Sequence, residues 1–308
     1  MNKGKRIILN ILKRPYMLAV YAAKRFPRLF NDRTYIALMY RAAFGKKPNL
    51  DRPKTYNEKL QWLKLNAADP SHAALVDKYL VKEFVREKAG DQCLIPTLGV
   101  WERFDDIDFA QMPSAFVLKC THDSGSVVIC KDKTTFDLQA ARKKLSAALA
   151  VNYFYKSREY PYKTVQPRII AEPYMEDLGS GQLYDYKIFC FNGEPKYMFI
   201  ASDRASEVKF DYFDVEFNRL PMRQVAHPNS TLEHKKPACF EEMLQTAKKL
   251  AEGLIQVRVD FYVVNDKMYF GELTFFHHGG FVPFVPEKYD DIWGDALRLP
   301  IVGDENIQ

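Results

Sequence analysis

Two apolar stretches joined by a short polar turn constrain the fold of this 308-residue chain more than any other feature. Residues 257–264 and 268–276 are rich in β-branched and aromatic side chains, and Asn265, Asp266 and Lys267 separate them. This pattern predicts an antiparallel hairpin in which Val264 pairs with Met268. Counting outward in that register places Asp260 directly opposite Glu272.

One face of the predicted hairpin is polar and the other is apolar, because side chains alternate along a strand. Arg258 and Thr274 join Asp260 and Glu272 on the polar face. The apolar face carries Val259, Phe261, Val263, Tyr269, Leu273 and Phe275. Directly opposed carboxylates lie only ~5 Å apart and repel each other unless a cation lies between them. Mg²⁺, which also binds substrate phosphates, would meet this need, so the polar face predicts a nucleoside triphosphate site.

A structural alternative for this face stays open. Arg258 alone could balance both acids as an ion pair, and a turn one residue longer or shorter would separate the two carboxylates. If the acids do face each other, replacing Asp260 or Glu272 by its amide is expected to abolish activity while leaving the fold intact or more stable.

The rest of the chain alternates helical and strand patterns, which predicts an α+β fold. Apolar residues at helical spacing predict helices over residues 78–88, 136–152 and 240–254. Strand patterns cover residues 94–100, 116–120, 127–130, 184–191 and 197–200. The last two strands flank Asn192-Gly193, the strongest short-range hairpin signal. Residues 1–68 show helical periodicity with a break at 45–53, which predicts a helical extension before the mixed region.

The basic residues are concentrated at the start of the chain. Eight of the 45 lysines and arginines precede residue 29, and no acidic residue precedes Asp32, although the net charge of the whole chain is only +6. Because apolar residues are interleaved with these cations, residues 1–28 could lie on an anionic membrane surface or could pack on the body as an ordinary helix. These two interpretations have equal support, and no nucleic-acid-binding motif accompanies the charge.

The composition indicates a globular protein, since 47% of the residues are hydrophobic. No apolar run approaches the ~20 residues that a bilayer span requires, and the apolar run 7–12 is too short and interrupted for a secretory signal. We therefore expect a cytoplasmic protein, placed at the inner face of the membrane if residues 1–28 bind it. The five cysteines lack metal-ligand spacing, which predicts reduced, buried thiols.

Several segments of the sequence occur in the order of a known set of motifs. They read RPKTYNEKLQWLKL, LVDKYLVKEFV, LIPTLGVWERFDDIDF, YDYKIFCFNGEPKY and GELTFFHHGG. In this order they resemble the teichuronopeptide-biosynthesis (TupA-like) branch of the ATP-grasp ligases, from about Gly45 to near the C-terminus. The resemblance implies an ATP-grasp fold in which two α+β subdomains clasp ATP. We expect the extension at 1–68, the first subdomain at 69–175 and the second at 176–308.

The resemblance also implies roles for individual residues in binding ATP. Lys78 and Lys119 match the lysines that reach the nucleotide phosphates, and Lys187 matches a residue on the terminal phosphate, for which Arg204 and Lys209 compete. The remaining nucleotide contacts fall on a phosphate loop and on adenine and ribose positions, namely Ser124, Gly125, Ser126, Glu172, Pro173, Tyr174 and Asp185. For Glu172 a structural salt bridge to a neighbour such as Arg168 is an equal alternative.

By the same resemblance, the polar face of the hairpin holds the metal and the reacting groups. Asp260, Glu272 and Thr274 match Mg²⁺ ligands, although many ATP-grasp enzymes have asparagine in place of this threonine. Arg258 matches the arginine that stabilises the tetrahedral intermediate, so catalysis would rest on Lys119, Lys187 and Arg258. The acyl acceptor would be recognised by His277, His278, Gly279 and Gly280. The alternative for the histidine pair is that one ring is buried and hydrogen-bonded.

The activity implied is that of an ATP-dependent carboxylate–amine ligase acting through an acyl phosphate. The TupA-like branch further implies a uronic acid of a surface polysaccharide or lipid-linked sugar as acceptor, joined to an amino acid or other amine. A glycosyltransferase of the same pathway is the alternative, with Asp106-Ile107-Asp108 as its metal motif. A scaffold without turnover is a third possibility, against which the retained lysines and paired acids argue.

Overall fold

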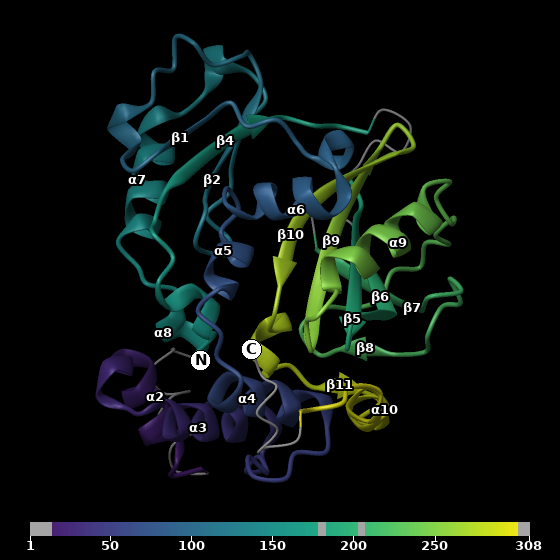
Figure 1. Cartoon of the computed structure of the whole chain (residues 1–308). Coiled ribbons are helices and arrows are strands. Elements are labelled where there is room, and N and C mark those ends of the chain that lie inside the picture. The colour runs from purple at the N-terminus through teal and green to yellow at the C-terminus, as the bar shows by residue number, and fades with distance from the viewer. Residues whose placement is uncertain (1–13, 178–182, 203–206, 301–308) are drawn as a thin grey trace.

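The structure is a computed structural model that describes residues 14–177, 183–202 and 207–300. Two antiparallel sheets face each other across the middle of the molecule, and helices from the beginning of the chain lie below both (Figure 1). A four-stranded sheet has the order β1-β4-β2-β3, and a five-stranded sheet has the order β10-β9-β5-β6-β7. This is the mixed α+β architecture that the sequence predicts.

The N-terminal helices divide between two packing environments. α2 (Met17–Arg25) packs on α3 (Asp32–Phe44) through a small cluster of its own, and the 3₁₀ turn η1 (Pro27–Leu29) joins them. α4 (Tyr56–Asn66) instead packs into the main core beside the five-stranded sheet. Its start is fixed by a capping box, in which Thr55 and Glu58 satisfy each other's backbone N–H groups.

The four-stranded sheet consists of β1 (Gly99–Trp101), β2 (Phe116–Cys120), β3 (Val128–Cys130) and β4 (Ile169–Pro173). α7 (Leu138–Leu149) covers one face through Ala141 and Leu145. The strand predicted over 94–100 is wrong in extent, because only residues 99–101 pair with β4. Pro96 has no N–H to donate to a ladder, and before Gly99 the Leu98 N–H bonds to the Ala171 carbonyl of β4 at 2.8 Å.

Short helices lie before and between the strands of the four-stranded sheet. They are α5 (His72–Val76), α6 (Val81–Ala89) and α8 (Phe154–Ser157), with 3₁₀ turns η2 (Asp91–Cys93), η3 (Phe104–Asp106), η4 (Lys133–Thr135) and η5 (Tyr160–Lys163). α6 starts three residues later than predicted, because the Asp77 carboxylate accepts hydrogen bonds from the Tyr79 and Leu80 N–H groups. Lys78 consequently lies in the turn before the helix, and its backbone N–H bonds to the Thr121 carbonyl.

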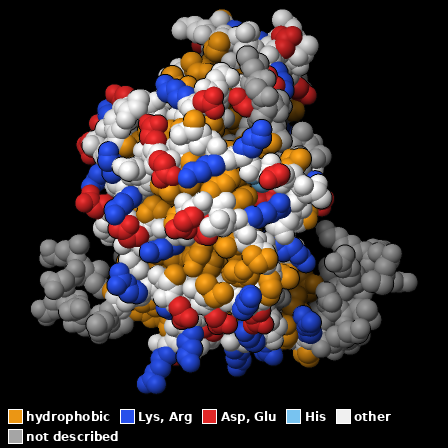
Figure 2. Space-filling model, turned by 90° about the vertical axis from the view of Figure 1, so that its right-hand side faces the viewer, with side chains coloured by type: hydrophobic (Ala, Val, Ile, Leu, Met, Phe, Trp, Pro, Cys, Tyr) orange, Lys and Arg blue, Asp and Glu red, His pale blue; other side chains and the backbone are white. Residues whose placement is uncertain are grey.

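The five-stranded sheet carries the larger core. Its strands are β5 (Asp185–Phe191), β6 (Glu194–Ser202), β7 (Lys209–Asp214), β9 (Gln256–Val264) and β10 (Lys267–Thr274). α9 (Phe240–Ala251) covers one face through Phe240, Met243 and Leu250. β8 (Arg223–Gln224) and β11 (Phe284–Val285) form a small ribbon beside η6 (His277–Gly280) and α10 (Lys288–Ala296). Over the face that carries α9, acidic and basic side chains are mixed, and apolar side chains gather in its lower half (Figure 2).

The central hairpin aligns Asp260 with Glu272 as predicted, although its turn differs from the predicted one. The turn has two residues, Asn265 and Asp266, both with positive φ, so Val264 pairs with Lys267 and the predicted pairing with Met268 is wrong. A bulge at Gly271 then adds one residue to β10 and restores the alignment of Asp260 with Glu272. A Cβ on Gly271 would lie 3.1 Å from the Asp260 carbonyl oxygen, so glycine suits this position.

Two further predictions concern the cysteines and the membrane. All five cysteines are free and buried, as the sequence predicts. Within the part of the chain that the structure describes, every helix is too short or too polar to span a bilayer.

Candidate active site

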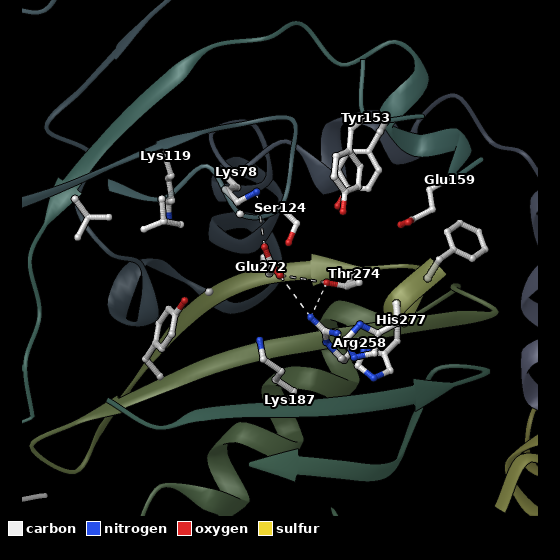
Figure 3. A pocket seen from close by; sticks show the side chains of 18 of the residues that line it. Lys78, Lys119, Ser124, Tyr153, Glu159, Lys187, Arg258, Glu272, Thr274 and His277 are labelled. Carbon is white, nitrogen blue, oxygen red and sulfur yellow. Dashed lines mark hydrogen bonds and ion pairs between the residues drawn. The ribbon is translucent and has the colours of Figure 1, made fainter. Parts of the chain in front are cut away.

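A cavity of about 660 Å³ lies between the two sheets, and most of the predicted site residues line it (Figure 3). The four-stranded side contributes Lys119 of β2 and Glu172, Pro173 and Tyr174 of β4 and the segment after it. The five-stranded side contributes Lys187, Arg258, Glu272 and Thr274. Lys78, Ser124, Gly125, His277, His278 and Gly279 complete the predicted set in the lining. The two sheets thus bring together residues as far apart in the sequence as Lys119 and Thr274.

The carboxylate of Glu172 holds two lysines at one end of the cavity. Lys119 Nζ and Lys82 Nζ each lie 2.6 Å from its oxygens. Burial raises the pKa of Glu172, but the two ammonium groups outweigh burial, so the pKa lies below its usual value. The alternative of a salt bridge for Glu172 is thus present, but its partners are Lys82 and Lys119 and not Arg168, which pairs with Asp77 at 2.8 Å. Lys82 was not predicted as a site residue.

Lys78 connects the two halves across the cavity. Its ammonium lies 3.8 Å from a Glu272 oxygen and donates to the Asp123 carbonyl in the loop between β2 and β3. Ser124 and Gly125 of this loop face the cavity. Ser126 does not, because its hydroxyl accepts from the Cys120 N–H and donates to Asp123, which holds the loop in shape.

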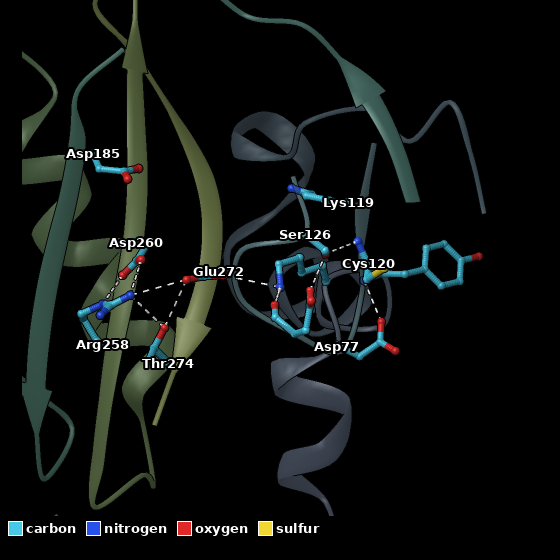
Figure 4. Close-up of polar contacts among 12 residues, drawn as sticks. Asp77, Lys119, Cys120, Ser126, Asp185, Arg258, Asp260, Glu272 and Thr274 are labelled. Carbon is cyan, nitrogen blue, oxygen red and sulfur yellow. Dashed lines mark hydrogen bonds and ion pairs between the residues drawn. The ribbon is translucent and has the colours of Figure 1, made fainter. Parts of the chain in front are cut away.

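Arg258 is the centre of a buried polar network (Figure 4). Its guanidinium binds Asp260 through Nε at 2.6 Å and Nη2 at 2.7 Å, and Nη2 also donates to Thr274 Oγ1 at 3.0 Å. Lys187, paired with Asp260 in the β5–β9 register, donates to the same carboxylate. Burial lowers the pKa of Lys187, and Asp260 opposes this effect.

The two predicted metal acids therefore have different environments. Asp260 is 1% exposed, has both oxygens engaged by Arg258 and Lys187, and does not line the cavity. Glu272 lies on the cavity wall, with 30% of its side chain exposed, and its nearest cations stand at 3.5 and 3.8 Å. Burial raises the pKa of Glu272, but Lys78, Lys187, Arg258 and Lys119 together lower it to about 2.

The chemistry of these donors fits Mg²⁺ in a limited way. The carboxylate of Glu272 and the hydroxyl of Thr274 are hard oxygen donors on the cavity wall, and Mg²⁺ needs only one or two carboxylates when phosphates supply further ligands. The residues described contain no cluster of three or more His, Cys, Asp or Glu side chains suited to a metal. Glu272 is thus the better placed of the two acids.

His277 supports Arg258 from behind. Arg258 Nη1 donates to His277 Nδ1 at 2.6 Å, so Nε2 carries the proton and donates to Gln224 Oε1 at 2.8 Å. Burial, with His278 and Arg258 nearby, holds the pKa of His277 well below its ordinary value. The ring is therefore neutral, buried and hydrogen-bonded, which is the structural alternative left open above, whereas His278 is exposed on the cavity rim.

The two glycines after the histidines fit the chain against α4. Both have positive φ, and the Gly279 and Gly280 carbonyls accept from Gln61 Nε2 at 3.1 and 2.9 Å. A Cβ on Gly279 would lie 2.8 Å from Ser157 Cβ, and one on Gly280 would collide with Gln61. Gly279 lines the cavity and Gly280 does not.

Five other predicted positions lie away from the cavity or outside the described chain. Asp185, at the start of β5, is buried beside Lys187 at 3.3 Å and does not line the cavity. Lys209 begins β7 and is also absent from the lining, while Arg204 lies outside the described residues. In the proposed Asp-x-Asp motif, Asp106 pairs with Arg103 and Asp108 caps a surface turn, so neither faces the cavity.

The cavity also contains a group of residues that sequence reasoning missed. Tyr153, Lys156, Ser157, Glu159 and Tyr162 come from α8 and the turn that follows it. This segment has no helical or strand periodicity. Its signal is a dense aromatic run interrupted by one lysine, one arginine and one glutamate.

The two lobes place lysines, an arginine and acidic residues around one cavity. This arrangement is typical of enzymes that bind a nucleotide. The sequence matches the TupA-like ATP-grasp family over residues 58–298. The chain therefore belongs to the TupA-like ATP-grasp family, which confirms the family and the fold that the motifs imply. ATP with Mg²⁺ is the cofactor pair typical of this fold. No curated protein matches the sequence closely enough to count as a relative.

Solved ATP-grasp ligases resemble the chain in structure at low sequence identity. The D-alanine–D-alanine ligase of Helicobacter pylori is 17% identical, with a TM-score of 0.41, and the match covers 80% of this chain and 69% of that one. The ATP complex of the D-alanine–D-alanine ligase from Bacillus anthracis is 14% identical, with a TM-score of 0.38, and the match covers 66% of this chain and 54% of that one. The ADP complex of N5-carboxyaminoimidazole ribonucleotide synthetase is 12% identical, with a TM-score of 0.43, and the match covers 71% of this chain and 50% of that one. This chain thus spans between half and about two thirds of their lengths.

Proposed function

We propose that this protein is an ATP-dependent carboxylate–amine ligase that activates its carboxylate substrate as an acyl phosphate. The observation that carries this proposal is the convergence of four cations on the cavity that contains Glu272: Lys119, Lys187 and Arg258 from the two sheets and Lys78 from the turn before α6. Four cations around one cavity suit a triphosphate and a carboxylate, because phosphoryl transfer depends mainly on positioning and charge neutralisation.

The nucleotide would bind with its base toward the four-stranded sheet. Apolar side chains of Ile95, Val117 and Ile129 line that end of the cavity, beside the backbone of Pro173 and Tyr174. The ion pair of Lys119 with Glu172 fixes a cation at the boundary between this apolar end and the charged middle. Such a surface matches the two parts of a nucleotide, one flat and apolar and the other anionic.

Glu272 and Thr274 would hold Mg²⁺, with Asp260 placed behind them. When bound, the metal would neutralise phosphate charge and polarise the transferred phosphoryl group. Asp260 would act on Arg258 and Lys187 by keeping both cations oriented. Arg258, held by Asp260, Thr274 and His277, is positioned as a fixed donor for an oxyanion that develops during acyl transfer.

The substrate pair is proposed by analogy with the TupA-like branch. A uronic acid of a bacterial surface polysaccharide, or of a lipid-linked precursor, would supply the carboxylate, and an amino acid or another amine would supply the nucleophile. The rival glycosyltransferase has little support, because Asp106 and Asp108 lie on a surface turn away from the cavity.

The test of this activity supplies ATP, Mg²⁺, uronic-acid oligosaccharides and a panel of amino acids, and follows products by mass spectrometry. We expect ADP together with an oligosaccharide whose mass has increased by one amide-linked amine. Hydrolysis of a nucleotide sugar with no ADP formation would instead identify a glycosyltransferase.

We also propose that the corner formed by α2 and η1 binds an anionic membrane surface at the inner face of the cytoplasmic membrane. Leu18, Phe26 and Leu29 of this corner are exposed, and their neighbours include Arg14, Lys24, Arg25 and Arg28. The opposite side of α2 packs on α3 through Val20 and Ala23, so the helix has a packed side and an outer side. Apolar side chains surrounded by cations are typical of peripheral membrane contacts. Residues 1–13 of the basic segment lie outside the described residues.

Removing the apolar side chains of this corner should weaken vesicle binding. With phosphatidylglycerol-containing vesicles, the double variant Phe26→Ser/Leu29→Ser should show at least about fivefold less bound protein than the wild type in co-sedimentation, because it loses apolar insertion. Ile292→Ser, which changes an exposed apolar residue of α10, is the control and should bind normally. Equal sedimentation of the double variant and the wild type would contradict the proposal.

A further inference from the structure

Glu159 lines the cavity but has no role in the proposed nucleotide and metal contacts. It precedes η5, is only 5% exposed, and directs its carboxylate into the cavity beside Tyr153 and above Thr274 (Figure 3). Carboxylates this deeply buried are rarely left without a cationic partner in proteins.

Of the glutamates that the structure describes, three line the cavity, and Glu159 differs from the other two. Glu172 is paired with Lys82 and Lys119, and Glu272 lies near Lys78 and Arg258. Among the residues that the structure describes, no Lys, Arg or His nitrogen lies within ion-pair distance of the Glu159 carboxylate, which accepts a hydrogen bond from Ser157 Oγ. Its charge is therefore balanced only at longer range.

The nearest buried cation, Lys64, is already committed to other acceptors. Its ammonium donates to Gln61 Oε1 at 2.9 Å, the Ser157 carbonyl at 2.8 Å and the Gly279 carbonyl at 2.6 Å. An ammonium has three donors, so none remains for Glu159. Burial raises the pKa of Glu159 and Lys64 opposes this effect, as expected for a carboxylate that lacks a direct partner.

The side chains around Glu159 suit an organic cation. Tyr153 and Tyr162 line the cavity and stack edge to face at 4.9 Å between ring centroids, whereas the Phe276 and Phe281 rings already lie 5.4 and 4.4 Å from the Lys64 ammonium. Aromatic faces beside a carboxylate are a common environment for ammonium groups. Lys156 also lines the cavity, but its side chain is exposed at the rim, so it does not fill the space beside Glu159.

We propose that Glu159, with Tyr153 and Tyr162, forms the subsite for the amine substrate, binds its ammonium group and takes one of its protons. This inference rests on the proposed ligase activity. In forming the amide, the ammonium loses two protons: Glu159 accepts one, and the departing phosphate takes the other together with the electrons of the broken carbon–oxygen bond. The nitrogen lone pair forms the new bond to the acyl carbon.

Binding measurements test the subsite without depending on turnover. The panel consists of the common amino acids, ethanolamine and ethylamine, observed by saturation-transfer NMR with wild-type protein. At least one amine should bind, its alcohol analogue should not, and Glu159→Gln should weaken the binding at least about tenfold. Glu159→Asp, which keeps the charge on a shorter side chain, should lie between the two, and the exposed Glu102→Gln should behave as wild type.

Activity measurements separate this inference from the proposed function. Hydroxylamine is largely uncharged at neutral pH, so Glu159→Gln should keep hydroxylamine-supported ADP release while losing amide formation with the bound amine and showing a higher KM for it. If neither the wild type nor the variant forms ADP, the ligase proposal fails. The binding measurements then still show whether Glu159 binds an amine. Binding of no amine to the wild type, or equal binding to wild type and Glu159→Gln, would overturn the inference.

Discussion

Replacing Asp260 by asparagine is expected to lower the free energy of unfolding by about 3–5 kcal/mol. The carboxylate is 1% exposed and is the closest acid to both Arg258 and Lys187, so the amide would leave two buried cations with only the more distant Glu272 and Asp185, at 3.5 and 3.3 Å. This outcome is the opposite of the sequence-based expectation that removing one of two opposed acids leaves the fold intact or more stable. Urea unfolding followed by circular dichroism measures the change.

A matched substitution and a double variant control this prediction. Asp51→Asn removes an exposed acid whose partner Arg33 is also exposed, and it should cost less than about 1 kcal/mol. Arg258→Met/Asp260→Asn removes one cation together with the acid, so its loss of stability should be smaller than the sum of the single losses. Additive losses, or an Asp260→Asn protein as stable as the wild type, would show that the pair is not coupled.

Replacing Glu272 by glutamine is expected to lower ADP formation at least about 100-fold while leaving the protein folded. Its side chain lies on the cavity wall, where the amide fits in the same space and the neighbouring cations lose only a partly exposed partner. Because the amide repels phosphate less than the carboxylate does, ATP should still bind. The gain in ATP affinity on adding Mg²⁺, measured by titration calorimetry with and without EDTA, should fall sharply.

The control for Glu272→Gln is Glu194→Gln, an exposed acid paired with Lys248 on the far side of the sheet. It should keep normal turnover and a normal effect of Mg²⁺ on ATP affinity. Wild-type ADP formation by Glu272→Gln would remove Glu272 from the site, and loss of its thermal unfolding transition would indicate a structural role instead.

The hairpin shows how much of the site the sequence could predict. The alternation of polar and apolar residues was enough to place Arg258, Asp260, Glu272 and Thr274 on one face, because side-chain direction follows from the strand alone. The turn was not predictable in the same way. Two residues with positive φ shortened it, and the bulge at Gly271 compensated, so the correct alignment of the acids resulted from two errors that cancel.

The environment of each acid depended on strands far apart in the sequence. Asp260 is buried because β5 lies beside β9 and brings Lys187 against it, a contact across 73 residues. No local pattern distinguishes Asp260 from Glu272, so the sequence assigned both to the metal. His277 likewise looked like a substrate contact until Gln224, from a two-residue strand without a sequence signal, fixed its outer nitrogen.

The amine end of the cavity escaped prediction for a related reason. Glu159, Tyr153 and Tyr162 lie in a segment whose order comes from tertiary contacts, including those of Lys64 on α4 with the Ser157 and Gly279 carbonyls. Position in such a segment is fixed by packing between distant parts of the chain rather than by periodicity. The N-terminal helix α4 thereby contributes to the shape of the site, which its amphipathic pattern alone did not indicate.

The most direct measurement of the central claim is acyl-phosphate trapping. Wild-type protein with ATP, Mg²⁺, a uronic-acid oligosaccharide and hydroxylamine should release ADP and form the hydroxamate of the oligosaccharide in equal amounts, and Glu272→Gln should form neither at a significant rate. ADP release without hydroxamate, or hydroxamate formed equally well without ATP, would contradict a ligase that activates its carboxylate substrate by phosphorylation.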